Sequence, residues 1–179
     1  VFLESVDQQR SATYADVSQF CRRLSQNLRK KGFGPNDRVA LLSNNALEHL
    51  LIYFGVMYYG ATICTIHVEM NAVIIKEILK TLDPMLVLFE EGIGLEEEII
   101  RSDYPARALG SWSQQDCTGF VAEVSGLSAE NPAPVYGPDD IATIFFTSGT
   151  TAEPKGILCS FRHLETNVAA VLEAFDIRA

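Results

Sequence analysis

The sequence IATIFFTSGTTAEPKG, residues 141–156, carries the strongest structural signal in this chain. Residues 141–146 are apolar and rich in β-branched and aromatic side chains, which predicts a buried strand. Residues 147–156 then place four hydroxyl side chains around a glycine and end in Pro-Lys-Gly. Backbone N–H groups in a tight turn form a concave anion site, hydroxyls add donors, and lysine supplies a compact positive charge. This strand and loop are therefore predicted to hold phosphate.

The loop does not match the Walker A motif, in which lysine follows glycine and precedes Ser or Thr. Here Pro154 precedes Lys155 and Gly156 follows it, so no hydroxyl next to the lysine is available for magnesium. An ordinary surface turn also uses Ser, Thr, Gly and Pro, and it stands as the structural alternative. The ordered ten-residue pattern favours the phosphate loop.

Composition indicates a folded protein and disfavours nucleic-acid binding. The chain has 179 residues, of which 47% are hydrophobic and 21% charged, so it is long enough to bury a sizeable core. A formal net charge of −9 argues against a general nucleic-acid surface, which is basic. The three histidines and four cysteines lack metal-ligand or redox spacing. We predict no metal site, reduced cysteines with Cys21 and Cys64 in the core, and a cytoplasmic location.

Residues 50–66 contain no charged side chain and reach the lower length limit of a membrane-spanning helix. Glycines, tyrosines and threonines dilute their hydrophobicity, and β-rich residues follow Gly60. A buried helix, a glycine stop and a buried strand explain the segment better. No transmembrane segment is predicted.

Alternating strand and helix patterns predict an α/β fold with a mostly parallel sheet flanked by helices. The expected strands are residues 38–42, 61–66, 85–89, 141–146 and 156–159. The expected helices begin after caps at Thr13, at residues 43–45 and at Asn71, and two more are expected at residues 95–102 and 162–175.

A change in composition predicts a division of the chain. Between residues 111 and 140 the periodic pattern gives way to Gly, Ser, Pro and Asp. We place a first βα subdomain at residues 1–134. Residues 135–179 are expected to begin a second subdomain, which carries the phosphate loop.

Residues 147–156 resemble the phosphate-loop signature of the adenylate-forming (AMP-binding) enzymes, which include acyl- and aryl-CoA synthetases, luciferases and peptide-synthetase adenylation domains. The usual form is Thr-Ser-Gly-Thr-Thr-Gly-x-Pro-Lys-Gly, and the departure is Ala152 at a glycine position. If that position needs positive φ, a Cβ there costs about 1 kcal/mol. Phe161 also stands where the family often has histidine, and we expect His163 to be a surface residue at a helix start. Weaker matches at residues 13–17, 34–40, 57–61 and 138–142 extend the resemblance over nearly the whole chain.

The resemblance implies the N-terminal part of the adenylate-forming enzyme fold and an AMP-forming ligase. In such enzymes a carboxylic acid attacks the α-phosphorus of Mg-ATP, giving acyl-adenylate and pyrophosphate, and coenzyme A then displaces AMP. The implied catalytic residue is Lys155. The implied ATP-binding residues are Thr147, Ser148, Gly149, Thr150, Thr151 and Lys155.

Several alternatives stay open at this point. An acyl- or aryl-CoA synthetase is the first interpretation, and the adenylation domain of a peptide synthetase or carboxylic acid reductase is the second. Family members continue beyond this segment into regions that bind adenine, ribose and Mg²⁺, so we expect an enzymatic parent protein and no activity from the segment alone. A catalytically inert folded fragment and a small self-contained nucleotide-binding module are further readings. The sequence does not indicate which acid is used or the oligomeric state.

Overall fold

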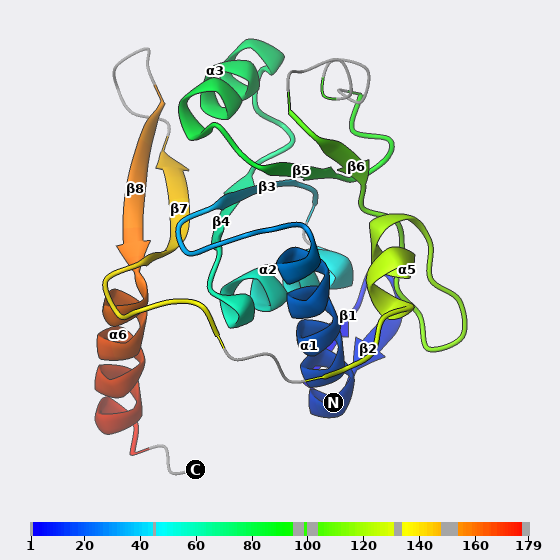
Figure 1. The fold of residues 1–179 in the computed structure, drawn as a ribbon, viewed down its shortest axis with the longest axis horizontal. Coiled ribbons are helices and arrows are strands. Elements are labelled where there is room, and N and C mark those ends of the chain that lie inside the picture. Colours follow the sequence, from blue (N-terminus) through cyan, green and yellow to red (C-terminus); the bar gives the residue numbers. More distant parts are fainter. Residues whose placement is uncertain are drawn as a thin grey trace.

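A six-stranded sheet with strand order β6-β5-β3-β4-β7-β8 forms the centre of the molecule (Figure 1). The computed structural model describes residues 2–44, 46–94, 99, 104–130, 134–147 and 154–176. The strands are β3 (Arg38–Leu42), β4 (Thr62–Ile66), β5 (Leu86–Phe89), β6 (Ala106–Ala108), β7 (Ile141–Thr147) and β8 (Lys155–Ser160). Every pairing from β6 to β7 is parallel, and β8 runs antiparallel to β7. The predicted mostly parallel α/β fold is confirmed.

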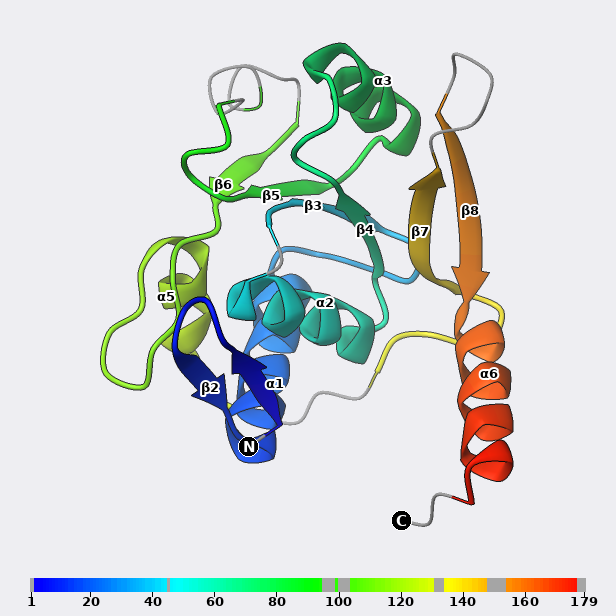
Figure 2. The ribbon, with the colours of Figure 1, turned by 180° about the vertical axis from the view of Figure 1, so that it is seen from behind.

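Helices cover both faces of this sheet. They are α1 (Tyr14–Lys30), α2 (Leu47–Tyr59), α3 (Ala72–Leu82), α5 (Gly119–Ser125) and α6 (Phe161–Ala174). Figures 1 and 2 show α1 and α2 on one side of the sheet and α3 on the other. Because strand side chains alternate between faces, Val39 and Leu41 join the core on the α1 and α2 side, while Ala40 and Leu42 join the core on the α3 side. A fully buried Leu contributes about 1.5–3 kcal/mol relative to an exposed one, so these two cores supply most of the stability.

Two of the three predicted helix caps are present. The Thr13 hydroxyl accepts a hydrogen bond from the Asp16 backbone N–H, and the Asp16 carboxylate accepts one from the Thr13 N–H, which together form a capping box. At the start of α3, the Asn71 side chain accepts a hydrogen bond from the Val73 N–H at 2.8 Å. Both helices begin where local sequence predicts.

The cap predicted for α2 at residues 43–45 is wrong. The N-cap is Ala46, which makes no side-chain cap hydrogen bond. The first helical N–H, that of Leu47, instead donates to Gln8 Oε1 at 3.0 Å. A residue 39 positions away therefore satisfies this helix start, and no local pattern could indicate it. Asn45 itself lies outside the described residues.

Several short elements were not predicted. They are the hairpin of β1 (Leu3–Ser5) and β2 (Arg10–Ala12), together with β6 and α5. A three-residue strand is too short to show periodicity, and α5 lies inside the Gly- and Ser-rich stretch that we interpreted as a connector. Apart from Ile99, which is buried, the helix expected at residues 95–102 lies outside the described residues.

The uncharged stretch 50–66 forms the helix, glycine stop and strand that its composition predicts. Gly60 ends α2 with φ of 105°, a left-handed conformation that favours glycine. A Cβ at this position would lie 2.5 Å from a ring carbon of Tyr136, so both backbone conformation and space require glycine. Within the described part of the chain, no helix is long and apolar enough to cross a bilayer.

The two cysteines predicted to lie in the core are buried. Cys21 is 5% exposed and Cys64 is fully enclosed. Burial disfavours the thiolate and raises the pKa of each thiol to about 12. Both side chains therefore act as small apolar core groups rather than as nucleophiles.

The β7–β8 hairpin joins the same sheet as the first strands, because β7 pairs with β4. Helix α6 leaves the end of β8 and projects away from the sheet (Figures 1 and 2). Within α6, only Phe161 is buried. The division of the chain into residues 1–134 and 135–179 stays a prediction.

A buried carboxylate ties the N-terminal hairpin to α2. Glu48, whose side chain is 3% exposed, accepts hydrogen bonds from both terminal nitrogens of Arg10 at 2.7 and 3.0 Å. It also accepts the backbone N–H of Trp112 at 2.7 Å and the amide of Gln8 at 3.3 Å. Burial by itself raises the pKa of Glu48, but the hydrogen bonds from Arg10 and Trp112 outweigh it, so the pKa lies below its ordinary value. Glu48 is therefore ionised and fully partnered at neutral pH.

Replacing Glu48 with alanine is expected to lower the free energy of unfolding by about 3–5 kcal/mol, because it leaves the Arg10 guanidinium without its buried partner. Urea denaturation at neutral pH measures this loss. Asp139→Ala is the matched control, because Asp139 pairs with Arg162 on the exposed surface, where breaking an ion pair is expected to leave the unfolding free energy nearly unchanged. Equal losses in the two variants would contradict a central role for Glu48.

The same carboxylate makes stability depend on pH. The folded-state pKa of Glu48 is depressed below 4.5, so the unfolded state binds more protons between the two values. The stabilisation is fully present above pH 4.5 and is lost as pH falls through the folded pKa. In Glu48→Gln, the unfolding free energy measured by urea denaturation is expected to change less with pH across this acidic range. An unchanged pH dependence would contradict the role of Glu48.

Candidate functional site

The predicted phosphate loop connects β7 to β8 at one edge of the sheet. Thr147 is the last residue of β7 and Lys155 is the first of β8, and the two pair directly across the hairpin. Because β7 is parallel to β4, its end lies at the carboxyl edge, where β3, β4 and β5 also end (Figure 1). Ligands of open α/β sheets bind outside the carboxyl ends of the strands. The hairpin therefore carries its loop at the edge where such folds bind small molecules.

The described residues cover only the two ends of the predicted loop. Thr147 and Lys155 come together at its base, and the Lys155 side chain is exposed to solvent. The other predicted phosphate-binding residues lie outside the described residues: Ser148, Gly149, Thr150 and Thr151. Ala152 and Glu153 lie outside them as well. Their roles stay predictions. The strand expected at residues 156–159 is confirmed and is one residue longer at each end.

Two similar turns support the opposite end of the hairpin. The sequence GPND at residues 34–37 precedes β3, and GPDD at residues 137–140 precedes β7. In each turn the glycine N–H donates to the carboxylate of the aspartate three residues later, at 2.7 Å in both cases. The aspartate N–H returns a hydrogen bond to the glycine carbonyl. Each turn is thus closed by its own aspartate and delivers the chain into a parallel strand.

Asn36 joins these two turns. Its side-chain amide N–H donates to Asp140 Oδ1 at 2.7 Å, and its side-chain oxygen accepts the Ile141 N–H at 2.8 Å. Its φ of 66° is left-handed, a conformation that asparagine tolerates better than most residues. Thr62 adds a hydrogen bond from its hydroxyl to the Ile141 carbonyl at 2.6 Å. Both backbone groups of the first β7 residue are therefore held by side chains from the β3–β4 part of the sheet.

The start of α6 fixes the end of β8. The Phe161 ring stacks on Tyr136 with centroids 3.8 Å apart, and Phe161 is 6% exposed. Ser160 and His163 form a capping box, in which the Ser160 hydroxyl accepts the His163 N–H and the Ser160 N–H donates to His163 Nδ1. His163 is an exposed helix-start residue, as expected, and Phe161 serves packing.

A polar cluster missed by sequence reasoning lies at the same carboxyl edge. The backbone N–H of Asn44, just after β3, donates to the carboxylate of Glu90, just after β5, at 2.7 Å. Ser43 Oγ lies 2.7 Å from His49 Nδ1. Burial lowers the pKa of His49, against the opposing effects of Ser43 and the Glu90 charge, so the imidazole is neutral at pH 7. The sequence signal for this cluster was a polar residue directly after each of two buried strands, Ser43 after β3 and Glu90 after β5.

Metal binding finds no support in the part of the chain that is described. No three His, Cys, Asp or Glu side chains within it come close enough to hold a metal ion. We therefore assign no Mg²⁺ ligand to any described residue.

Comparison with known proteins identifies related sequences and folds. A family model described as "AMP-binding enzyme" matches residues 1–178. The long-chain-fatty-acid–CoA ligase of Thermus thermophilus is 34% identical over 154 residues, which cover 85% of this chain and 28% of that protein. Tyrocidine synthase 3 of Brevibacillus parabrevis is 28% identical over 151 residues, which cover 84% of this chain and 2% of that protein.

A solved structure shares the fold described above. It is ATP-bound MatB from Rhodopseudomonas palustris, with a TM-score of 0.78 and 22% identity over 93% of this chain and 33% of that one. The chain thus spans about a third or less of the length of each of these proteins.

Replacing Asn36 with glycine is expected to lower the unfolding free energy by about 1–2 kcal/mol, because two side-chain hydrogen bonds are lost while the left-handed backbone stays favourable. Amide hydrogen exchange is expected to accelerate at Ile141, whose N–H loses its acceptor. Exchange at Val73, which is capped by Asn71, is the internal control and is expected to stay unchanged. Unaltered exchange at Ile141 would show that the Asn36 side chain does not protect this N–H.

Proposed function

Because this chain belongs to the AMP-binding enzyme family, we propose that it is the amino-terminal, phosphate-binding part of a ligase that activates a carboxylic acid with ATP. The observation that supports this proposal is the β7–β8 hairpin, in which Thr147 and Lys155, from the sequence TSGTTAEPKG, pair at the carboxyl edge of a parallel sheet. The fold shared with ATP-bound MatB supports the use of ATP. ATP binding is thus proposed for the edge where both the fold and the sequence pattern favour an anion.

The proposed reaction has two steps. An oxygen of the substrate carboxylate forms a bond to the α-phosphorus of ATP, and the bond from that phosphorus to the oxygen bridging to the β-phosphorus breaks. The products are acyl-adenylate and pyrophosphate. A thiol then attacks the acyl carbon, the thiol proton is lost to solvent or a base, and AMP leaves with the electron pair of the broken C–O bond.

Each loop residue has a role in this proposal that follows from its chemistry. Thr147, Ser148, Thr150 and Thr151 donate hydroxyl hydrogen bonds to phosphate oxygens, and Gly149 lets the backbone approach closely. Lys155 is the catalytic residue. Its ammonium offsets the negative charge that develops on the departing pyrophosphate, which is electrostatic stabilisation of the transition state. Its position at the base of the hairpin, exposed and opposite Thr147, leaves it free to reach a bound nucleotide.

Coenzyme A is the proposed acceptor of the acyl group. This choice rests on the 34% identity to the Thermus long-chain-fatty-acid–CoA ligase. A second candidate is the adenylation domain of a peptide synthetase, because tyrocidine synthase 3 is also similar. The carboxylic acid, Mg²⁺ as the companion of ATP, and a cytoplasmic location belong to the proposal as well.

Lys155→Ala in the intact ligase is expected to slow adenylate formation by about 10²-fold or more, because the leaving group loses its positive partner. Pyrophosphate release during a single turnover measures this step directly. Lys80→Ala is the control, since Lys80 is an exposed lysine on the last turn of α3, and it is expected to retain the parent rate. Unchanged pyrophosphate release in Lys155→Ala would remove that residue from the mechanism.

The 179-residue chain on its own is expected to show no ATP–pyrophosphate exchange, because the proposed function assigns it only the phosphate loop and not the adenine or ribose contacts. The assay follows labelled pyrophosphate into ATP in the presence of a mixture of carboxylic acids. Exchange above the rate of a Lys155→Ala form of the same chain would show a complete site and overturn this expectation.

A further inference from the structure

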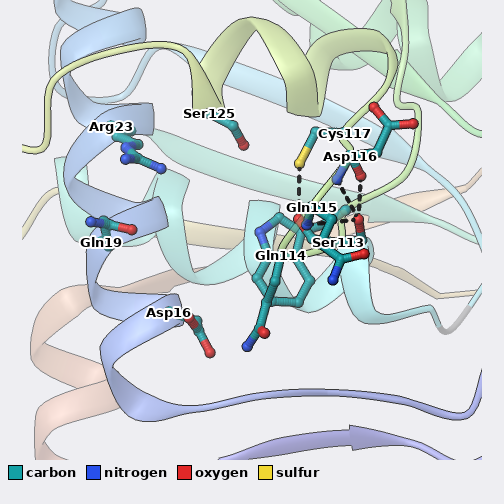
Figure 3. A pocket seen from close by; sticks show the side chains of 10 residues that line it. Asp16, Gln19, Arg23, Ser113, Gln114, Gln115, Asp116, Cys117 and Ser125 are labelled. Carbon is teal, nitrogen blue, oxygen red and sulfur yellow. Dashed lines mark hydrogen bonds between the residues drawn. The ribbon is translucent and has the colours of Figure 1, made fainter.

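A polar hollow of about 520 Å³ lies between α1, α5 and the loop of residues 112–117 (Figure 3). Asp16, Gln19 and Arg23 line it from α1, and Ser125 closes it from the last position of α5. The volume is within the range of pockets that hold small molecules, about 300–1,000 Å³. The hollow lies on the α1 side of the sheet, away from the end of the hairpin that carries Thr147 and Lys155 (Figures 1 and 2).

The loop that forms one wall is held in shape by its own hydrogen bonds. The backbone N–H groups of Gln115 and Asp116 both donate to the Ser113 hydroxyl, at 3.3 and 2.7 Å. The Cys117 thiol donates to the Ser113 carbonyl at 3.3 Å. This wall is preorganised, so a ligand need not order it.

Two polar atoms at the hollow lack hydrogen-bond partners. Arg23 Nε and Ser125 Oγ are shielded from solvent and have no partner in the described structure. A buried polar group without a hydrogen-bond partner destabilises the folded state. Figure 3 shows the Arg23 guanidinium and the Ser125 hydroxyl both directed toward the hollow. Because both atoms are shielded from solvent, each side chain has to rotate to meet a ligand, and a ligand oxygen that accepts from it then supplies the missing hydrogen bond.

The two carboxylates that line the hollow, those of Asp16 and Asp116, are directed elsewhere than Arg23. Asp16 lies seven residues earlier on α1, about 10 Å along the helix axis, and its carboxylate is engaged by the N–H and hydroxyl of Thr13. The hydrogen bonds from Thr13 lower the pKa of Asp16 and keep it committed to the helix cap. The Asp116 carboxylate points away from Arg23 in Figure 3.

We propose that this hollow binds a small organic carboxylate, held by the Arg23 guanidinium and the Ser125 hydroxyl. The Nε–H and a terminal N–H of arginine form a planar fork that matches the two oxygens of a carboxylate. Trp112, Gln19 and Gln115 line the remaining space, which leaves room for the chain that carries the carboxylate. The site goes beyond the proposed ligase function and does not depend on it, because no residue of the phosphate loop takes part.

Isothermal titration of the intact protein with hexanoate tests the proposal, and hexanamide serves as the neutral probe of equal size. Arg23→Gln is expected to raise the Kd of hexanoate at least tenfold, and Ser125→Ala about fivefold, as expected for loss of a charged and of a neutral hydrogen bond. Arg22→Gln is the matched control, because Arg22 is the exposed neighbour of Arg23 and does not line the hollow. Hexanoate affinity is expected to be unchanged in it.

Three results would overturn the proposal. Hexanoate that binds Arg23→Gln as tightly as the parent protein is held elsewhere, including in a substrate site. Hexanamide of equal affinity would show that the carboxylate is not recognised, and inorganic phosphate that displaces hexanoate at equal concentration would show a general anion site. Thermal unfolding without ligand verifies that each variant is folded, and Ser125→Ala provides a second test if Arg23→Gln is not.

Discussion

The hydrogen bonds that Asn36 makes with Asp140 and Ile141 hold the β7–β8 hairpin where it joins the sheet. They link residues 104 and 105 positions apart in the chain, so their formation closes a long loop. From Ile141 the strand continues into the observed parallel pairing of β7 with β4, which leads to Thr147 at the carboxyl edge. The candidate site thus depends on a contact at the far end of the strand that carries it. An asparagine in a left-handed turn suits this task because its short amide offers a donor and an acceptor together.

Apolar burial stabilises this fold, and directional polar contacts determine how its elements are arranged. The two cores on the faces of the sheet supply most of the stabilisation, but apolar contacts are non-directional and would tolerate shifted strands. Directional contacts select one arrangement. Glu48 orients the N-terminal hairpin against α2, and the Asn36 bridge orients β7 against β3 and β4. Loss of Glu48 removes the carboxylate that pairs with Arg10, and loss of Asn36 removes the acceptor of the Ile141 N–H, so each loss weakens one directional contact.

The parts that sequence predicts well are those with local signals. The strands β3, β4, β5 and β7 have apolar runs of strand length, and α1 and α3 have caps within three residues of their starts. Elements whose stabilising partners are distant were missed or misassigned. The start of α2 depends on Gln8, and the loop that contains Trp112 is held by Glu48, 64 residues away. At the candidate site, the sequence predicts the loop motif. It does not predict the support of β7 by Asn36 or the polar cluster around Glu90, because these contacts join residues far apart in the chain.

The two departures from the family pattern, Ala152 and Phe161, fall in different parts of the hairpin sequence. Among the described residues, the pair Thr147 and Lys155 is the one nearest the loop in the ladder between β7 and β8. The departure at Ala152 falls between these two residues in the sequence and lies outside the described residues. Phe161, the other departure, lies at the anchored end, where its ring packs on Tyr136. In the proposed function Ala152 belongs to the phosphate-binding pattern, whereas Phe161 acts through the attachment of β8 and α6.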